Sequence, residues 1–180
     1  MRTTLAKSFT ASALSCALAL IPVARVAAQQ NNPCADKPCN VVFDWGGSAT
    51  LPDPDRHFGL PSELEASFLS TLQSGGMHVT AGQAGSLVIT VRLTPQDRVL
   101  CETMPGMYPD YSCHTVQRAS VVFASSDASV KLPGRVDVSP RCSDPVLHPA
   151  YAAFGQFAAQ TVIYTVLNGG KGDRPTIKCV

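Results

Sequence analysis

Charged side chains are scarce in this sequence. Asp, Glu, Lys and Arg make up 15% of the 180 residues. Lys and Arg together number 14, and Asp and Glu 13, so the formal net charge is +1 and neither sign is in excess. Because a nucleic acid is bound by a surface on which Lys and Arg are concentrated, we expect no nucleic-acid partner.

The short motifs of several enzyme classes are also missing. The sequence contains no G-x-S-x-G nucleophile elbow, no P-loop, no G-x-G-x-x-G dinucleotide fingerprint and no H-E-x-x-H zinc-protease motif. A Ser-His-Asp triad stays open, because its members are brought together only by folding. These absences favour a protein without catalytic activity, for which we expect no cofactor.

An apolar run lies near the N-terminus, over residues 11–21. Arg2 and Lys7 precede it, and small residues follow it up to Ala28, which is the order of a secretory signal peptide. We therefore predict a signal peptide over residues 1–28. The remaining residues, 29–180, are enough for one hydrophobic core and are predicted to form a single domain.

A retained membrane anchor fits this N-terminal run less well. A membrane span needs roughly 20 apolar residues, whereas Pro22 and Arg25 interrupt the run early. Cys16 stands among apolar residues without the pattern of a lipoprotein cleavage box. We expect the mature chain to have no transmembrane span and to be periplasmic or secreted.

Six of the seven cysteines lie beyond the predicted signal peptide. An even number of cysteines in an exported chain predicts disulfides. From local spacing, we expect the pairs Cys101–Cys113 and Cys34–Cys39, which leaves Cys142 to pair with Cys179. A zinc finger would need a second closely spaced pair of ligands beside Cys34 and Cys39, and the sequence has none, so we expect no metal site.

Two segments have the pattern of helices. The first begins at a capping box formed by Ser62 and Glu65 and ends at Gly75-Gly76. Its apolar residues recur on one face: Leu64, Phe68 and Leu72. The second, from His148 to Asn168, contains no charged residue. Such a helix is buried on several sides or docked on a partner or a bilayer surface, and of these we favour burial in the core.

Strand patterns occupy most of the remaining chain. They cover residues 41–45, 77–80 and 86–93, a hairpin of 98–102 with 115–124, and a second hairpin over 130–138 around Pro133-Gly134. With the helices they predict an α+β fold. We expect a mainly antiparallel sheet packed by two helices, in one disulfide-stabilised domain.

The predicted loop between Cys101 and Cys113 is the first candidate binding surface. It contains Met104, Met107, Tyr108 and Tyr111. Methionine and tyrosine on a loop closed by a disulfide provide adaptable apolar area at little ordering cost. A secreted inhibitor that presents this loop is one alternative function.

The predicted loop that contains Asp53, Asp55 and His57 is the second candidate site. Two carboxylates beside a histidine could bind a cation or perform acid–base chemistry, and turn formation explains the same residues equally well. A small secreted hydrolase that uses these three residues is therefore another alternative function.

The order of elements resembles bacterial cell-envelope α/β modules. The resemblance lies in residues 64–80, with the helix and the strand after Gly75-Gly76, and in residues 84–91, with the alternating strand Leu87-Val88-Ile89-Thr90-Val91. The modules in question are small periplasmic lipoproteins and the TolB N-terminal and CsgG-like assembly domains. The resemblance implies a non-enzymatic binding or scaffold role in the cell envelope or outside the cell. We expect the partner to be another envelope or extracellular protein.

Overall fold

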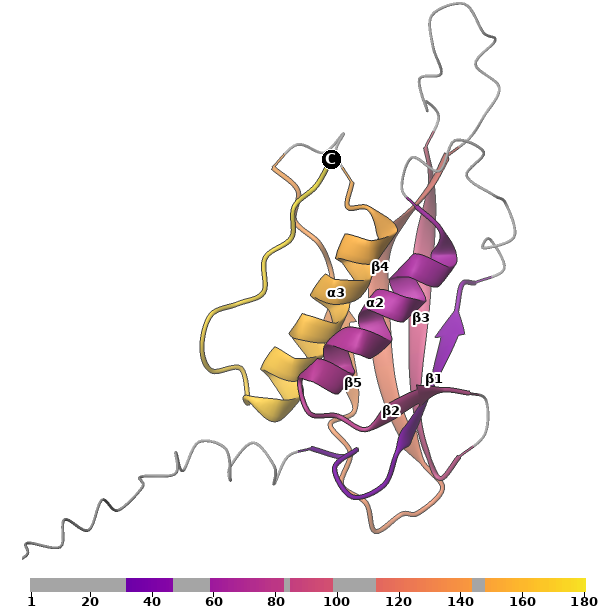
Figure 1. Ribbon diagram of the computed structural model, residues 1–180, viewed down its shortest axis with the longest axis vertical. Coiled ribbons are helices and arrows are strands. Elements are labelled where there is room, and N and C mark those ends of the chain that lie inside the picture. The colour runs from indigo at the N-terminus through magenta and orange to yellow at the C-terminus, as the bar shows by residue number, and fades with distance from the viewer. Residues whose placement is uncertain (1–31, 47–58, 83–84, 99–112, 144–147) are drawn as a thin grey trace, which may run out of the picture.

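The computed structural model describes residues 32–46, 59–82, 85–98, 113–143 and 148–180. These residues form one five-stranded sheet with two helices on one of its faces (Figure 1). The α+β class and the two covering helices agree with the prediction. No helix in the described residues is long and apolar enough to cross a membrane.

The sheet has the strand order β2-β1-β3-β4-β5 and is mixed rather than purely antiparallel. Its strands are β1 (Cys39–Asp44), β2 (Val79–Ala81), β3 (Leu87–Arg98), β4 (Cys113–Ser125) and β5 (Arg135–Val138). β1 runs parallel to both β2 and β3, whereas β4 is antiparallel to both of its neighbours, β3 and β5. The helix between β1 and β2 brings the chain back to the end of the sheet at which β1 begins, so β2 runs parallel to β1.

The chain then passes from β2 on one side of β1 to β3 on the other, and the described residues nearest this passage, Gly82 and Gly85, both lie against the side chain of Asn40. The Thr80 hydroxyl donates a hydrogen bond to Asn40 Oδ1 at 3.2 Å. A Cβ atom at Gly85 would collide with Asn40 Nδ2, and one at Gly82 would lie 3.0 Å from Oδ1. Glycine at both positions therefore permits this short crossing, which places β3 beside β1.

The first helix, α2 (Pro61–Ser74), begins earlier than the predicted capping box. The carboxylate of Glu63, not that of Glu65, accepts a hydrogen bond from the backbone N–H of Leu60 at 3.1 Å. Pro61 favours this earlier start, because it has no N–H and its fixed φ suits the first helical position. Glu65 instead accepts a hydrogen bond from the indole of Trp45 at 3.3 Å.

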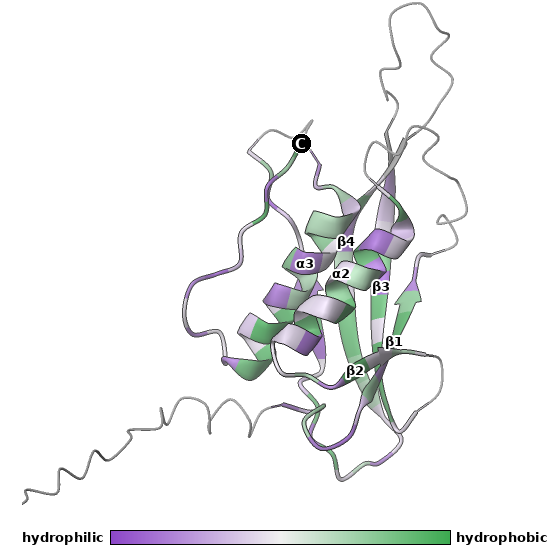
Figure 2. Ribbon diagram, viewed as in Figure 1, coloured by the Kyte–Doolittle hydropathy of each residue, from purple (hydrophilic) through white to green (hydrophobic). Residues whose placement is uncertain are grey.

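The second helix, α3 (Tyr151–Val162), continues into a π-helical segment, η1 (Ile163–Leu167). Its buried residues are Tyr151, Phe154, Gly155, Ala158, Ala159 and Val162. α3 packs against α2, β4 and β5, which agrees with the expectation that the uncharged helix is part of the core. Figure 2 shows hydrophobic residues along β1, β3 and β4 beneath the two helices.

The predicted hairpin over residues 130–138 does not form. Only its second half is a strand, β5, and its partner is β4. Gly134 has φ +76°, and its carbonyl accepts a hydrogen bond from the N–H of Phe123 at 3.0 Å. The turn at Pro133-Gly134 therefore leads the chain onto the edge of β4 instead of back onto residues 130–132.

Two of the expected disulfides are present in the described residues. Cys34 is bonded to Cys39, and Cys142 is bonded to Cys179. The second bond fastens the C-terminal segment to the residues that follow β5. Cys101 lies outside the described residues, so the Cys101–Cys113 pair stays a prediction.

Candidate functional site

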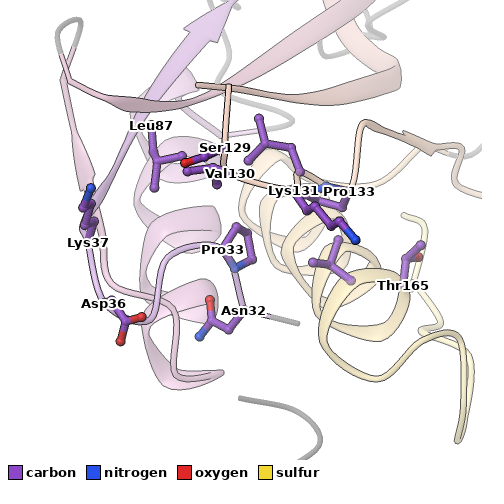
Figure 3. A pocket seen from close by; sticks show the side chains of 12 residues that line it. Asn32, Pro33, Asp36, Lys37, Leu87, Ser129, Val130, Lys131, Pro133 and Thr165 are labelled. Carbon is purple, nitrogen blue, oxygen red and sulfur yellow. The ribbon is translucent and has the colours of Figure 1, made fainter. Parts of the chain in front are cut away.

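A hollow of about 720 Å³ lies where three segments that are distant in the sequence meet (Figure 3). The segments are the loop before β1, the loop between β4 and β5, and η1. Its lining residues are Asn32, Pro33, Asp36, Lys37, Leu87, Ser129, Val130, Lys131, Leu132, Pro133, Thr165 and Val166. The volume lies within the range of small-ligand sites, about 300–1,000 Å³.

The first wall of this hollow is the small ring that the Cys34–Cys39 disulfide closes. Both cysteines are buried. Their backbones bond to His78, whose N–H donates to the carbonyl of Cys34 at 3.0 Å and whose carbonyl accepts from the N–H of Cys39 at 2.9 Å. Asn32 donates through Nδ2 to the carbonyl of Gly76 at 2.9 Å. The wall is therefore held by the sheet and by the end of α2.

The second wall is held by Asp127, at the start of the loop between β4 and β5. Its carboxylate accepts hydrogen bonds from the Ser129 hydroxyl at 2.6 Å and from the Ser129 backbone N–H at 3.0 Å. These two bonds, and to a smaller extent the positive charge of Lys37, lower the pKa of Asp127 below its ordinary value of 3.8. The ionised carboxylate thus orders the loop that carries Val130 and Lys131.

Removing the Ser129 hydroxyl is expected to raise the pKa of Asp127. Because the pKa is lowered in the folded protein, the carboxylate stabilises the fold above its unfolded-state pKa, and this stabilisation is lost as the pH falls through the folded-state pKa. The stability difference between wild type and Ser129→Ala should therefore be present at neutral pH and vanish in acid below the range of an ordinary aspartate. Carboxyl NMR titration measures the pKa directly.

Ser126→Ala is the matched control, because the Ser126 hydroxyl donates to the Ser86 carbonyl and not to Asp127. It should leave the Asp127 titration unchanged. An Asp127 carboxyl that titrates at the same pH in wild type and Ser129→Ala would contradict the assignment of these bonds.

Charge and apolar surface are combined in this hollow. Lys37 and Lys131 stand on opposite walls (Figure 3), and Asp36 is the lining carboxylate. Leu87 and Val166 are buried and provide apolar surface. Two ammonium groups beside an apolar base suit the binding of a group that has both an acidic end and a hydrocarbon part.

Of the predicted site residues that the structure describes, Cys34 and Cys39 support one wall of this hollow. The loop residues Met104, Met107, Tyr108 and Tyr111, and the cluster Asp53, Asp55 and His57, lie outside the described residues. The sequence carried no signal for the hollow, because Lys37 and Lys131 are isolated lysines that only folding brings together. Within the described residues, no group of three or more His, Cys, Asp or Glu side chains could hold a metal ion.

Comparisons with known proteins find no match among protein-family models and none among curated proteins. Among solved structures, the chain is similar to a crystal structure described as a minor lipoprotein from Acinetobacter baumannii. The sequences are 12% identical, the TM-score is 0.36, and the match covers 80% of this chain and 98% of that one. A likeness at this level does not place the chain in a family.

Proposed function

We propose that this chain is an exported protein that binds another envelope or extracellular protein through the hollow between the Cys34–Cys39 ring and the loop before β5. The observation that carries the proposal is that both walls are fixed before a partner arrives. One is closed by a buried disulfide, and the other is held by the bonds between Asp127 and Ser129. A preformed wall lowers the ordering cost of binding.

The disulfides also support the proposed compartment. Structural disulfides persist in the periplasm and outside the cell, whereas the cytosol keeps thiols reduced. Cys34 and Cys39 are buried in the core cluster, so the oxidised ring is part of the packed fold. The predicted signal peptide over residues 1–28 completes this proposal.

The compartment is tested by the intact mass of the protein from its native host, with thiols alkylated before reduction. We expect a chain that starts at Gln29 and takes up no alkylating reagent. A retained N-terminus, a lipid adduct or an alkylated cysteine would contradict export as a soluble disulfide-bonded protein.

The binding role is tested by capturing partners from the host's envelope fraction on the immobilised, oxidised protein. Reversing charge in the hollow, with Lys37→Glu and Lys131→Glu together, should weaken capture of a specific protein by about tenfold or more, because each lost ion pair with an acidic group also becomes a repulsion. The exposed pair Arg118→Glu and Lys171→Glu makes the same change in net charge away from the hollow. Equal capture by both double variants, or no specific capture by wild type, would exclude binding at this site.

A further inference from the structure

The strand next to this hollow is β5, which forms one edge of the sheet among the described residues. In an antiparallel pair, successive residues direct their backbone groups alternately toward the partner strand and away from it. Because the Gly134 carbonyl bonds to Phe123, the backbone N–H and C=O groups of Val136 and Val138 point toward β4. Arg135 and Asp137 therefore direct their N–H and C=O groups outward, where another strand could pair with them.

An extended segment lies on the other side of this open edge. Residues 171–180, here called the C-terminal strap, run back along α3 (Figure 1). Its first end is held by a hydrogen bond from Gly170 N–H to the Tyr164 carbonyl at 2.8 Å, and its last residue, Val180, exchanges two backbone hydrogen bonds with His148. Pro175, Ile177 and Cys179 are half-buried and alternate with exposed residues, which is the side-chain pattern of a strand.

A second hollow, of about 600 Å³, separates β5 from the strap. Asp137, Ser139 and Arg141 line it on one side, and residues 174–177 line it on the other. Phe157, Thr161 and Tyr164 of α3 and η1 contribute to the same lining. Among the described residues, no backbone hydrogen bond joins β5 to the strap. The slot therefore lies between two extended segments that do not pair with each other.

The ends of the slot are defined. The Cys142–Cys179 disulfide joins its two sides immediately beyond Arg141. In the other direction it meets the hollow of Figure 3 at Thr165, which lines both. The two hollows therefore adjoin at Thr165, and together, here called the trough, they are lined by residues from Lys131, before β5, to Arg141, after it.

The charges of the slot favour an acidic occupant. Asp137 is neutralised by Arg135, whose Nε lies 2.7 Å from its carboxylate. Arg141 and Arg174 stand on opposite sides of the slot and form no ion pair within the described residues. Guanidinium groups in this arrangement suit a carboxylate.

We infer that the trough binds an extended peptide segment of the partner, which adds a strand to β5 and places an acidic side chain between Arg141 and Arg174. Main-chain hydrogen bonds to the open edge would supply affinity, and the two guanidinium groups would select the acidic residue. The inference rests on the proposed binding function and extends it by naming the chemistry of the partner's segment.

The test uses a phage-displayed library of random linear peptides, selected on the oxidised full-length protein. We expect enriched peptides that share an acidic residue. Asp137→Pro removes the outward N–H of β5, whereas Asp137→Ala removes the same carboxylate and keeps that N–H. Proline is tolerated at an edge strand whose N–H faces outward. Binding of a synthetic enriched peptide should weaken about tenfold more in Asp137→Pro than in Asp137→Ala.

A second variant keeps the test independent of whether Asp137→Pro folds. Arg141→Glu with Arg174→Glu should weaken the same peptide about tenfold or more, and the charge-matched pair Arg92→Glu and Arg118→Glu, on β3 and β4, should not. An absence of enriched peptides, or enriched peptides whose affinity is the same in all variants, would overturn the inference. Capture of a folded protein that depends on Lys37 and Lys131, without any peptide binding, would overturn the peptide proposal and leave the proposed function standing. Peptide binding without such capture would support a peptide site in the trough and would exclude the proposed binding of a folded protein through Lys37 and Lys131.

Discussion

Replacing Gly155 with alanine should destabilise the protein by about 3 kcal/mol or more, at the upper end of the cost of overpacking a core. A Cβ atom at this position would overlap the backbone carbonyl oxygen of Leu64 in α2 and lie 3.0 and 3.1 Å from that residue's C and Cα atoms. Because the obstacle is backbone, no side-chain rotation removes it. The helices would have to separate, although α2 and α3 form the layer that covers the sheet.

Urea unfolding measures this effect, and Gly172→Ala is its control. Gly172 has φ +96° and no atom within 4 Å of an added Cβ, so alanine there introduces only backbone strain, about 1 to 2 kcal/mol. Alanine is also the better helix former by about 1 kcal/mol, which opposes the expected loss at Gly155. A Gly155→Ala protein as stable as wild type would show that the helices do not approach as closely as described.

Removing the Cys142–Cys179 disulfide, as Cys142→Ala with Cys179→Ala, should reduce the free energy of unfolding by about 4 kcal/mol. The two residues are separated by 37 positions in the sequence, and the bond therefore removes much of the conformational freedom of the unfolded chain. The same chain-entropy reasoning predicts about 2 kcal/mol for Cys34–Cys39, whose sequence separation is 5. Urea unfolding of the two double variants compares them.

Amide hydrogen exchange shows which part of the strap loosens when the Cys142–Cys179 disulfide is removed. The amide of Val180 bonds to the carbonyl of His148, next to the disulfide end of the strap, and should lose its protection. The amide of Gly170 bonds to Tyr164 at the other end of the strap and should keep it, so each spectrum contains its own reference. An unchanged unfolding free energy, with Val180 still protected, would mean that packing alone holds the strap. Peptide binding in the slot should fall with the loss of Val180 protection.

Local patterns predicted the elements more accurately than the contacts between them. The face of α2 formed by Leu64, Phe68 and Leu72 is buried as its periodicity predicts, because a helical face depends on residues three or four apart. The pattern predicts the start of α2 too late, because either Glu63 or Glu65 could serve as the capping acid. Pro61 favours the earlier start, at which Glu63 caps the helix. The pair Cys34–Cys39 followed from its short spacing, and the distant pair Cys142–Cys179 followed from elimination among few cysteines.

The partners of the strands and the candidate site were not predictable in this way. The pattern of residues 130–138 is compatible with a local hairpin, and only the pairing of β5 with β4 shows that this strand extends the sheet instead. Lys37, Lys131 and Thr165 share a hollow although nothing in their neighbouring residues marks them. Isolated polar residues carry no period or spacing that could reveal a common site.

The α+β class, the positions of the main helices and strands, and the Cys34–Cys39 pair follow from local sequence patterns, because periodicity and spacing are properties of neighbouring residues. Three features follow only from the packing of the folded chain: β1 is parallel to both of its neighbours, Gly155 contacts the backbone of α2, and β5 forms the edge of the sheet that faces the strap. These features depend on which surfaces meet, and such contacts join residues that no local pattern connects.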